Sequence, residues 1–332
     1  ILEEFDCELI LAYYFEPYGL VASQLAHIHN KRFVLLHAGS DVGRLSKHPH
    51  LRKSYEWMLK QANMVHTEPK SESHATLKQL GLQKSQQGRI ANFLSWKEYM
   101  TLGNKFDFDL EEVVTAMDGW YEKIKIREEL QSFLRQTNNK KFDPNKPTIG
   151  MYGKVGSKKH NSEVLQALAR LSEENFEYNF IWIAVGGKYI ARSYEEIFSL
   201  PNVSKNTWIL PAIAPWRIAP LIKQCDLVFF LEHNFEITFH TPRVPLEVLL
   251  NESCLICTKE VAEKPGYGEF LEDKKTFLQI QDPTDTEELT KTLRYALLNE
   301  TTRKRIAVAG RTRLEELLAE DEKTAKVKSK KE

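Results

Sequence analysis

The sequence predicts an α/β protein with two domains, each built on a parallel β-sheet. Short apolar segments, of the length of buried strands, alternate with longer segments that have the periodicity of amphipathic helices. This alternation occurs twice, over residues 1–92 and again from residue 147. The chain has 332 residues, of which 42% are hydrophobic, so it is long enough to bury about two cores.

In the first half, three strands and three helices alternate. The apolar runs predict strands at 8–14, 33–37 and 64–67, and the amphipathic runs predict helices at 20–29, 51–61 and 71–80. Gly81 is expected to end the third helix. This order predicts a parallel sheet covered on both faces.

The segment 93–146 differs in composition and is predicted to be a helical insertion followed by a linker. Residues 110–135 are charged and helical in pattern, with Trp120 and Tyr121 as expected packing contacts. Residues 138–147 are polar and contain two prolines, as linkers often do.

The second half repeats the α/β pattern and predicts a second Rossmann-like domain over 147–318. Its predicted strands are 149–153, 180–185, 208–213, 225–231 and 254–258, with helices at 161–171, at 215–224 and after residue 243. Residues 319–332 form a charged tail for which we expect no regular structure.

Composition excludes several classes of function. Lys and Arg total 46 and Asp and Glu total 46, so no net charge favours nucleic acid. No apolar run approaches the roughly 18 residues of a membrane span, and from these residues we expect no signal peptide. Cys254 and Cys257 are spaced as CxxC but lie inside an apolar run, so buried strand cysteines are expected instead of a metal or redox site. A reducing, cytoplasmic setting fits four scattered cysteines.

Polar residues gather in two loops of the second half, each between a predicted strand and a helix. The first, with Lys154 and Lys159 after Gly153, would suit a diphosphate, or it is a solvated basic loop. The second precedes a helix that carries Glu247 in its first turn. Glu247 would hold a ribose hydroxyl pair, or it only caps the helix.

His37 ends a predicted strand in the first half and precedes a Gly-Ser-Asp loop. Such a position points into a cleft in α/β proteins, so His37 is a candidate to bind substrate or hold a proton. The alternative is a histidine that is satisfied by neighbouring backbone.

These residues together resemble a retaining GT-B glycosyltransferase of family four. Residues 153–160 match the family's Gly-Arg-x4-Lys-Gly with both cationic positions kept and the final glycine replaced by His160. Glu247 matches the second glutamate of its Glu-x7-Glu motif, whereas the first falls on Phe239. Residues 185–187, 282–289 and 36–41 are similar to three further family segments. The resemblance covers most of 1–92 and 148–315.

The resemblance implies a GT-B fold, with two Rossmann-like domains facing across a cleft. The family's glycine-rich opening unit has no counterpart here, so we expect the first domain to be incomplete and the chain, which begins at Ile1, to be a fragment or processed product. Whether such a fragment is active alone stays open.

The resemblance also implies a reaction, in which a hexose moves from a nucleoside diphosphate sugar to a glycan or lipid-linked acceptor, as in polysaccharide biosynthesis. Peripheral contact with a membrane is compatible with a lipid-linked acceptor. No cofactor or metal is expected, because lysines can neutralise the departing diphosphate. The residues that the resemblance assigns to diphosphate are Gly153, Lys154, Lys159, Thr241 and Arg243; those assigned to ribose or sugar are Glu247 and His240; those assigned to catalysis are His37 and Glu236.

A second hypothesis is a non-catalytic GT-B-like protein that binds a ligand or a partner. Phe239 in place of the first motif glutamate and the absent opening unit favour this hypothesis. The retained Lys154, Lys159, Glu247 and His37 favour the enzyme.

Overall fold

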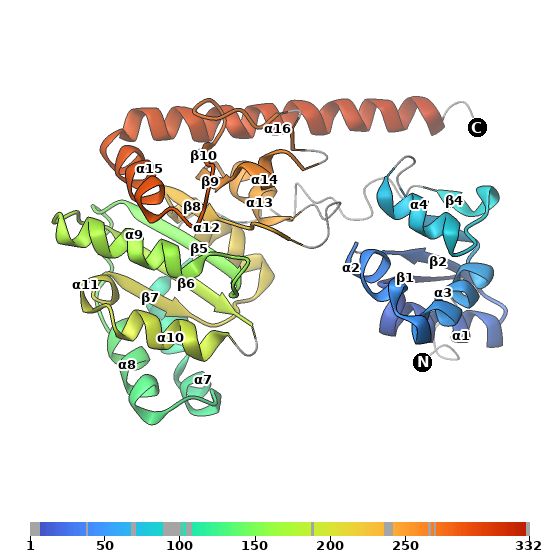
Figure 1. The fold of residues 1–332 in the computed structure, drawn as a ribbon, viewed down its shortest axis with the longest axis horizontal. Helices are drawn as coiled ribbons and strands as arrows, with labels where there is room; N and C mark the ends of the chain where they lie inside the picture. Colours follow the sequence, from blue (N-terminus) through green and yellow to red (C-terminus); the bar gives the residue numbers. More distant parts are fainter. Residues whose placement is uncertain are drawn as a thin grey trace. The chain divides into compact units, whose positions relative to one another are not determined.

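The structure, a computed structural model, describes residues 7–37, 39–67, 71–88, 101, 103, 108–186, 189–235, 242–264, 267–268 and 270–329. Internal contacts divide the chain into two compact units, which we name unit 1 (1–93 with 236–241) and unit 2 (94–235 with 242–332) (Figure 1). This division does not test the domain limits expected from the sequence, which stay predictions.

Unit 1 contains a four-stranded parallel sheet in the order β1-β2-β3-β4. Its elements are β1 (Leu9–Tyr13), α1 (Leu20–Ile28), β2 (Arg32–Leu36), α2 (Ser40–Gly43), α3 (Pro49–Gln61), β3 (Met64–His66), α4 (Glu72–Gln79) and β4 (Gln87–Gly88). The three predicted strands and three predicted helices are all present. Gly81 has a φ of 103°, a backbone conformation that favours glycine, and it follows the end of α4 as expected.

Unit 2 contains a six-stranded, all-parallel sheet in the order β10-β9-β8-β5-β6-β7. Its strands are β5 (Thr148–Lys154), β6 (Asn179–Val185), β7 (Thr207–Leu210), β8 (Leu227–Phe230), β9 (Cys254–Thr258) and β10 (Leu278–Ile280). Its helices are α6 (Leu110–Thr115), α7 (Asp118–Lys123), α8 (Glu128–Asn138), α9 (Asn161–Glu173), α10 (Ile190–Phe198), α11 (Pro201–Ser204), α12 (Ile218–Gln224), α13 (Val244–Leu250), α14 (Lys259–Ala262), α15 (Thr286–Leu298) and α16 (Glu300–Ser329).

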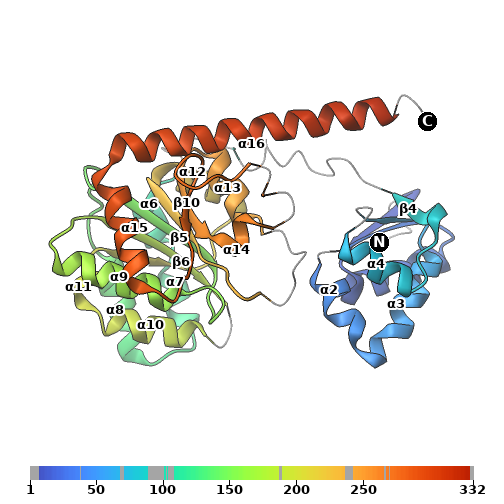
Figure 2. The same ribbon diagram turned by 45° about the horizontal axis from the view of Figure 1, so that its top comes forward.

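Two groups of helices pack on the unit 2 sheet. Helix α9 contacts both α10 and α15, and α13 contacts both α12 and α16 (Figures 1 and 2). The strand order runs outward from β5 to β6 and β7, and then from β8 to β9 and β10 on the other side. Because parallel crossovers are right-handed, this reversal places the two groups on opposite faces. Strands β8 and β9 are therefore buried along their whole length.

The buried thiols of β9 agree with the sequence analysis. Cys254 and Cys257 are completely buried in the strand. Burial raises the pKa of Cys254 to about 12, so its thiol is not ionised at neutral pH.

Residues 110–138, which the structure describes in full, form three short helices, α6, α7 and α8, where the sequence predicted one helix over 110–135. The prediction of a single helix is wrong because the chain is extended at Ile124 and Arg127. Ile124 and Ile126 are β-branched, which favours extended backbone, and both pack against the core of unit 2. Tyr121 is buried in that core, as expected for a packing contact.

The C-terminal residues also differ from the expectation. Helix α16 continues to Ser329, whereas the charged composition predicted a tail without regular structure. The expectation is based on how little apolar surface these residues can bury. It is wrong because Glu, Lys and Ala favour helical backbone even without such burial. Among the helices that the structure describes, none is both long enough and apolar enough to cross a lipid bilayer.

Asn138 connects α8 to the edge strand of the unit 2 sheet. Its side chain accepts a hydrogen bond from the Ile209 N–H (2.7 Å) and donates to the Ile209 carbonyl (2.8 Å) and to the Tyr121 hydroxyl (2.7 Å). Asn138 is 2% exposed, so these groups are shielded from water. The Asn138 side chain thus forms with Ile209 of β7 the two hydrogen bonds that the backbone of a neighbouring strand would otherwise form.

We expect Asn138→Leu to destabilise the protein by about 2–4 kcal/mol, because it leaves the Ile209 backbone groups buried without partners. The measurement is urea unfolding followed by circular dichroism. Asn139→Leu is the matched control, since Asn139 is the exposed next residue. Equal effects of the two substitutions would contradict the assigned role.

Candidate functional site

The carboxyl ends of β5 and β8 define the candidate site in unit 2. These strands are neighbours, yet their chains continue in opposite directions across the sheet. A reversal of this kind sends the chain after the two strands to opposite faces of the sheet and leaves, beside their loops, a crevice at which α/β proteins bind ligands. The two loops are residues 155–160, before α9, and residues 231–243, before α13.

The first loop exposes backbone and a lysine at the end of β5. Gly153 has a φ of 118°, and no heavy atom lies within 4 Å of where a Cβ would be. Lys154 is exposed. The Gly156 N–H donates to Asn161 Oδ1 (3.2 Å), and His160 has a left-handed φ of 50° that turns the chain into α9. The end of β5 therefore offers the exposed side chain of Lys154 and open space over the backbone of Gly153.

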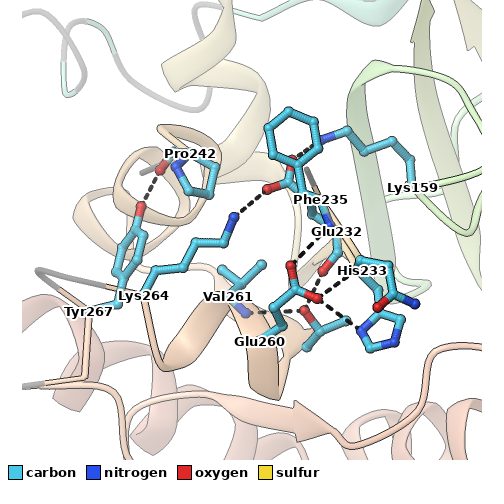
Figure 3. A network of polar contacts seen from close by, with 11 residues as sticks. Lys159, Glu232, His233, Phe235, Pro242, Glu260, Val261, Lys264 and Tyr267 are labelled. Atoms are coloured by element: carbon cyan, nitrogen blue, oxygen red, sulfur yellow. Dashed lines mark hydrogen bonds and ion pairs between the residues drawn. The ribbon is translucent and has the colours of Figure 1, made fainter. Parts of the chain in front are cut away.

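Lys159, in the same loop, belongs to a buried cluster of charges (Figure 3). Its ammonium contacts one oxygen of Glu232, and Lys264 Nζ lies 2.8 Å from the other. Glu232 lies two residues after the end of β8 and is 0% exposed, and Lys264 follows α14 and is 5% exposed. The Lys159 side chain is 23% exposed. Two ammonium groups thus share one carboxylate, and the cluster has a net charge of +1.

Aromatic rings complete the surroundings of both lysines. Lys159 Nζ lies 4.9 Å from the centre of the Phe230 ring and 5.5 Å from that of Phe235. Lys264 Nζ lies 5.3 Å from the Phe235 ring centre. Burial alone would raise the pKa of Glu232, but the two ammonium groups hold it below its usual value. Glu232 is therefore ionised at neutral pH.

Glu260 holds the start of the second loop. Its carboxylate accepts hydrogen bonds from the N–H groups of Asn234 (2.6 Å) and Phe235 (3.2 Å) and lies 3.2 Å from His233 Nδ1 (Figure 3). The His233 N–H donates to the Lys158 carbonyl of the first loop (3.1 Å). The two loops are therefore directly connected.

Helix α13 carries Glu247 toward β5. The Tyr152 hydroxyl, on β5, donates a hydrogen bond to Glu247 Oε2 (2.6 Å). Burial and the neighbouring Glu247 raise the pKa of Tyr152 well above its usual value, so the hydroxyl remains a donor. Arg243 is exposed immediately before α13, and the Tyr267 hydroxyl donates to the Pro242 carbonyl. The start of this helix is thereby fixed.

His37, the candidate of unit 1, follows β2 as predicted. The Gly39 N–H donates to its Nδ1 (3.3 Å), which places the proton of the neutral ring on Nε2. Burial lowers the pKa of His37, His66 adds to this effect, and Asp41 opposes it. The carboxylate of Asp41 is itself fully buried and accepts the Phe15 N–H (3.0 Å), so it holds the loop in place.

The structure brings together some of the predicted residues. Lys159, Glu247, Gly153 and Lys154 lie on β5, on α13 or in the first loop. Glu236, His240 and Thr241 lie outside the described residues.

Sequence reasoning missed Glu232, Lys264, Glu260 and Tyr152. Glu232 had a detectable signal, since it is an acid directly after a buried strand. Lys264 had none, because only the fold shows that it lies beside Glu232.

Among the residues that the structure describes, cavities lie at both ends of the strands of the unit 2 sheet. One of about 330 Å³ is lined by residues of both loops, including Ser157, Lys158 and His233. A larger one, of about 940 Å³, lies at the opposite edge, where β5 and β8 begin. Its Arg303 and Arg311 are paired with Asp226 and Glu252, so we place the site at the carboxyl edge. Among the described residues, no group of three or more acidic, His or Cys side chains is arranged to hold a metal ion.

Comparison with known proteins identifies the family. The family model described as glycosyl transferases group 1 matches residues 133–313, which is more than half of the chain. The chain belongs to this glycosyltransferase family. No curated protein sequence matches the chain.

Solved structures of other proteins share the fold. HepE from Anabaena, in complex with UDP, is 15% identical, with a TM-score of 0.57 over 98% of this chain and 79% of HepE. Sucrose-phosphate synthase from Thermosynechococcus elongatus is 14% identical, with a TM-score of 0.56 over 98% of this chain and 75% of the synthase. A glycosyltransferase from Rickettsia africae is 15% identical, with a TM-score of 0.52 over 96% and 98%. With the two parallel sheets, this likeness confirms the predicted GT-B fold class.

The lowered pKa of His37 predicts how the stability of this glycosyltransferase depends on pH. The unfolded chain takes up a proton near the usual pKa of 6.5, but the folded chain does so only at lower pH. The free energy of unfolding should therefore be unaffected by His37 above about pH 7 and decrease as the pH falls below about 6.5.

His37→Asn should weaken this acid dependence, measured as urea unfolding at pH 7.5 and 5.5. His29→Asn is the control, because His29 is exposed. A histidine NMR titration that shows His37 protonating above 6.5 would contradict the prediction.

Proposed function

We propose that the protein is a retaining glycosyltransferase that moves a hexose from a nucleoside diphosphate sugar to a glycan or lipid-linked acceptor. The observation that carries the proposal is the placement of Lys159 in the loop after β5 and of Glu247 on α13, the helix after the adjacent parallel strand β8. A lysine there suits a diphosphate, and a carboxylate suits a ribose diol. Membership of the family supports the reaction class.

The proposed chemistry depends on the leaving group. The bond between the anomeric carbon and the diphosphate oxygen breaks, and negative charge grows on the diphosphate. Lys159 and Lys154 stabilise that charge, together with the N–H groups where α9 begins, and no metal is required. The acceptor hydroxyl then attacks the anomeric carbon from the face that the diphosphate leaves and gives its proton to the departing diphosphate oxygen, so the configuration is retained.

Glu247 is proposed to hold the ribose. A carboxylate can accept about four hydrogen bonds, so the bond from the Tyr152 hydroxyl leaves capacity for two ribose hydroxyls. Arg243 and Thr241 are proposed to add contacts to the diphosphate, and His240 and Glu236 contacts to the sugar. His37 is proposed to act on the sugar through a neutral imidazole, consistent with its lowered pKa.

A second candidate function is a non-catalytic protein of the same fold. Two observations favour it: Phe239 replaces the first glutamate of the family motif, and the Lys159 ammonium is already paired with Glu232. Such a protein would bind a nucleotide or a partner without cleaving a sugar donor.

The first test concerns binding. Lys159→Met and Glu247→Gln should each weaken the affinity for UDP, GDP or ADP by about tenfold or more, because charged hydrogen bonds contribute about 1.5–3 kcal/mol each. Isothermal titration calorimetry gives the dissociation constants. Lys205→Met removes the same charge from an exposed position before β7, at the other edge of the sheet, and should leave affinity unchanged. Unaltered binding by both site variants would exclude this site.

The second test separates the two candidate functions. The protein is incubated with UDP-, GDP- and ADP-glucose, and released nucleoside diphosphate is measured together with the anomeric configuration of the free sugar by early-time NMR. We expect slow hydrolysis with retention, and for His37→Ala a loss of rate that is far larger than the loss of thermal stability. Binding of a nucleoside diphosphate without cleavage of any donor would favour the non-catalytic candidate.

A further inference from the structure

The cluster of Lys159, Glu232 and Lys264 raises a problem of charge. A lysine that binds a diphosphate must keep its positive charge available, yet the Lys159 ammonium contacts a carboxylate. If Glu232 were paired with Lys159 alone, the pair would be neutral and would attract a diphosphate weakly.

Lys264 resolves this problem. It contacts the second oxygen of Glu232 at 2.8 Å and is almost completely buried. Glu232 and Lys264 together contribute no net charge, so the cluster keeps the single positive charge of Lys159. Lys159 is also the member of the cluster with the most exposed side chain.

We propose that Lys264 and Glu232 are positioning residues that set the charge and the location of Lys159 for the diphosphate. Glu232 holds the ammonium of Lys159 beside the Phe230 ring, and Lys264 offsets the charge of Glu232. Lys264 acts through Glu232, because its own side chain is 5% exposed. This inference rests on the proposed function, since it assigns a role within the same phosphate site.

A purely structural role is the alternative explanation. Glu232 lies at the start of the second loop, where its carbonyl accepts a hydrogen bond from Thr258 Oγ1 (2.6 Å). The cluster would then only hold that loop in place. The two explanations differ in how affinity responds when charges are removed singly and together.

The experiment uses three variants, Lys264→Met, Glu232→Gln and the double variant that combines them. The cluster then has a net charge of 0, +2 and +1, against +1 in the wild type. Affinities for UDP, GDP and ADP are measured by calorimetry at low and moderate salt. Circular dichroism and thermal melting establish that each variant is folded.

We expect Lys264→Met to weaken nucleoside diphosphate binding by about tenfold, more at low salt than at high salt. Glu232→Gln should bind at least as tightly as the wild type, because the amide oxygen can still accept from Lys159 and keep it in place while the net charge of the cluster rises. The double variant should return to within about threefold of the wild type, even though it lacks two of the cluster's charged groups. Because breaking one partner of a buried pair can prevent folding, the double variant and Glu232→Gln test the proposal even if Lys264→Met does not fold.

Other results would overturn the proposal. If Glu232→Gln and the double variant both weaken binding tenfold, the cluster holds the loop and does not set the charge. If folded Lys264→Met binds like the wild type, the inference fails while the proposed function stands, provided that Lys159→Met still loses affinity. If the wild type binds none of the three nucleotides, the proposed function and this inference fail together.

Discussion

The position of β5 between β8 and β6 determines where the loops of unit 2 can bind a ligand. Gly150 of β5 permits this strand to pack closely against Cys225 and Val228. A Cβ added at Gly150 would lie 2.7 Å from Cys225 Sγ and 3.1 Å from Val228 Cγ2. Gly310 of α16 has a similar role, because a Cβ there would lie 2.5 Å from the Thr276 carbonyl oxygen. Because all six strands are parallel, they end at the same edge of the sheet. Since β5 lies beside β8, the loops that follow these two strands are neighbours.

Two carboxylates flank β8, and they differ in how their charge is balanced. Asp226, just before the strand, accepts the Thr148 N–H (2.8 Å) and pairs with Arg303 (2.8 Å), so its cluster is neutral. Glu232, just after the strand, is shared by two lysines. The first arrangement joins β5, β8 and α16 at the amino edge. The second leaves one positive charge at the carboxyl edge, which is where an anionic ligand is expected.

Much of this fold follows from local patterns, whereas the site depends on contacts between distant segments. The strands and helices around Lys159 and Glu247 could be predicted from apolar periodicity, and their loops from the rule that parallel strands share a carboxyl edge. The Lys264 contact with Glu232 spans 32 positions, and the Tyr152 contact with Glu247 spans 95. No spacing rule links such pairs. The single helix expected over 110–135 failed for a related reason, because core packing of Ile124 and Ile126 outweighs the helical pattern.

The burial of Glu232 also decides how its contact with Lys159 should be interpreted. A carboxylate that blocked the phosphate site would have to lie on the solvent side of the lysine and would be exposed when no ligand is bound. Glu232 is 0% exposed and the Lys159 side chain is 23% exposed, so the carboxylate lies behind the ammonium. A diphosphate could therefore approach the exposed side of Lys159 without displacing Glu232. The ammonium has three N–H donors, and a buried carboxylate that engages one of them orients the others. The ion pair that at first favours the non-catalytic candidate is thus compatible with a prepared phosphate site, as the proposed transferase requires.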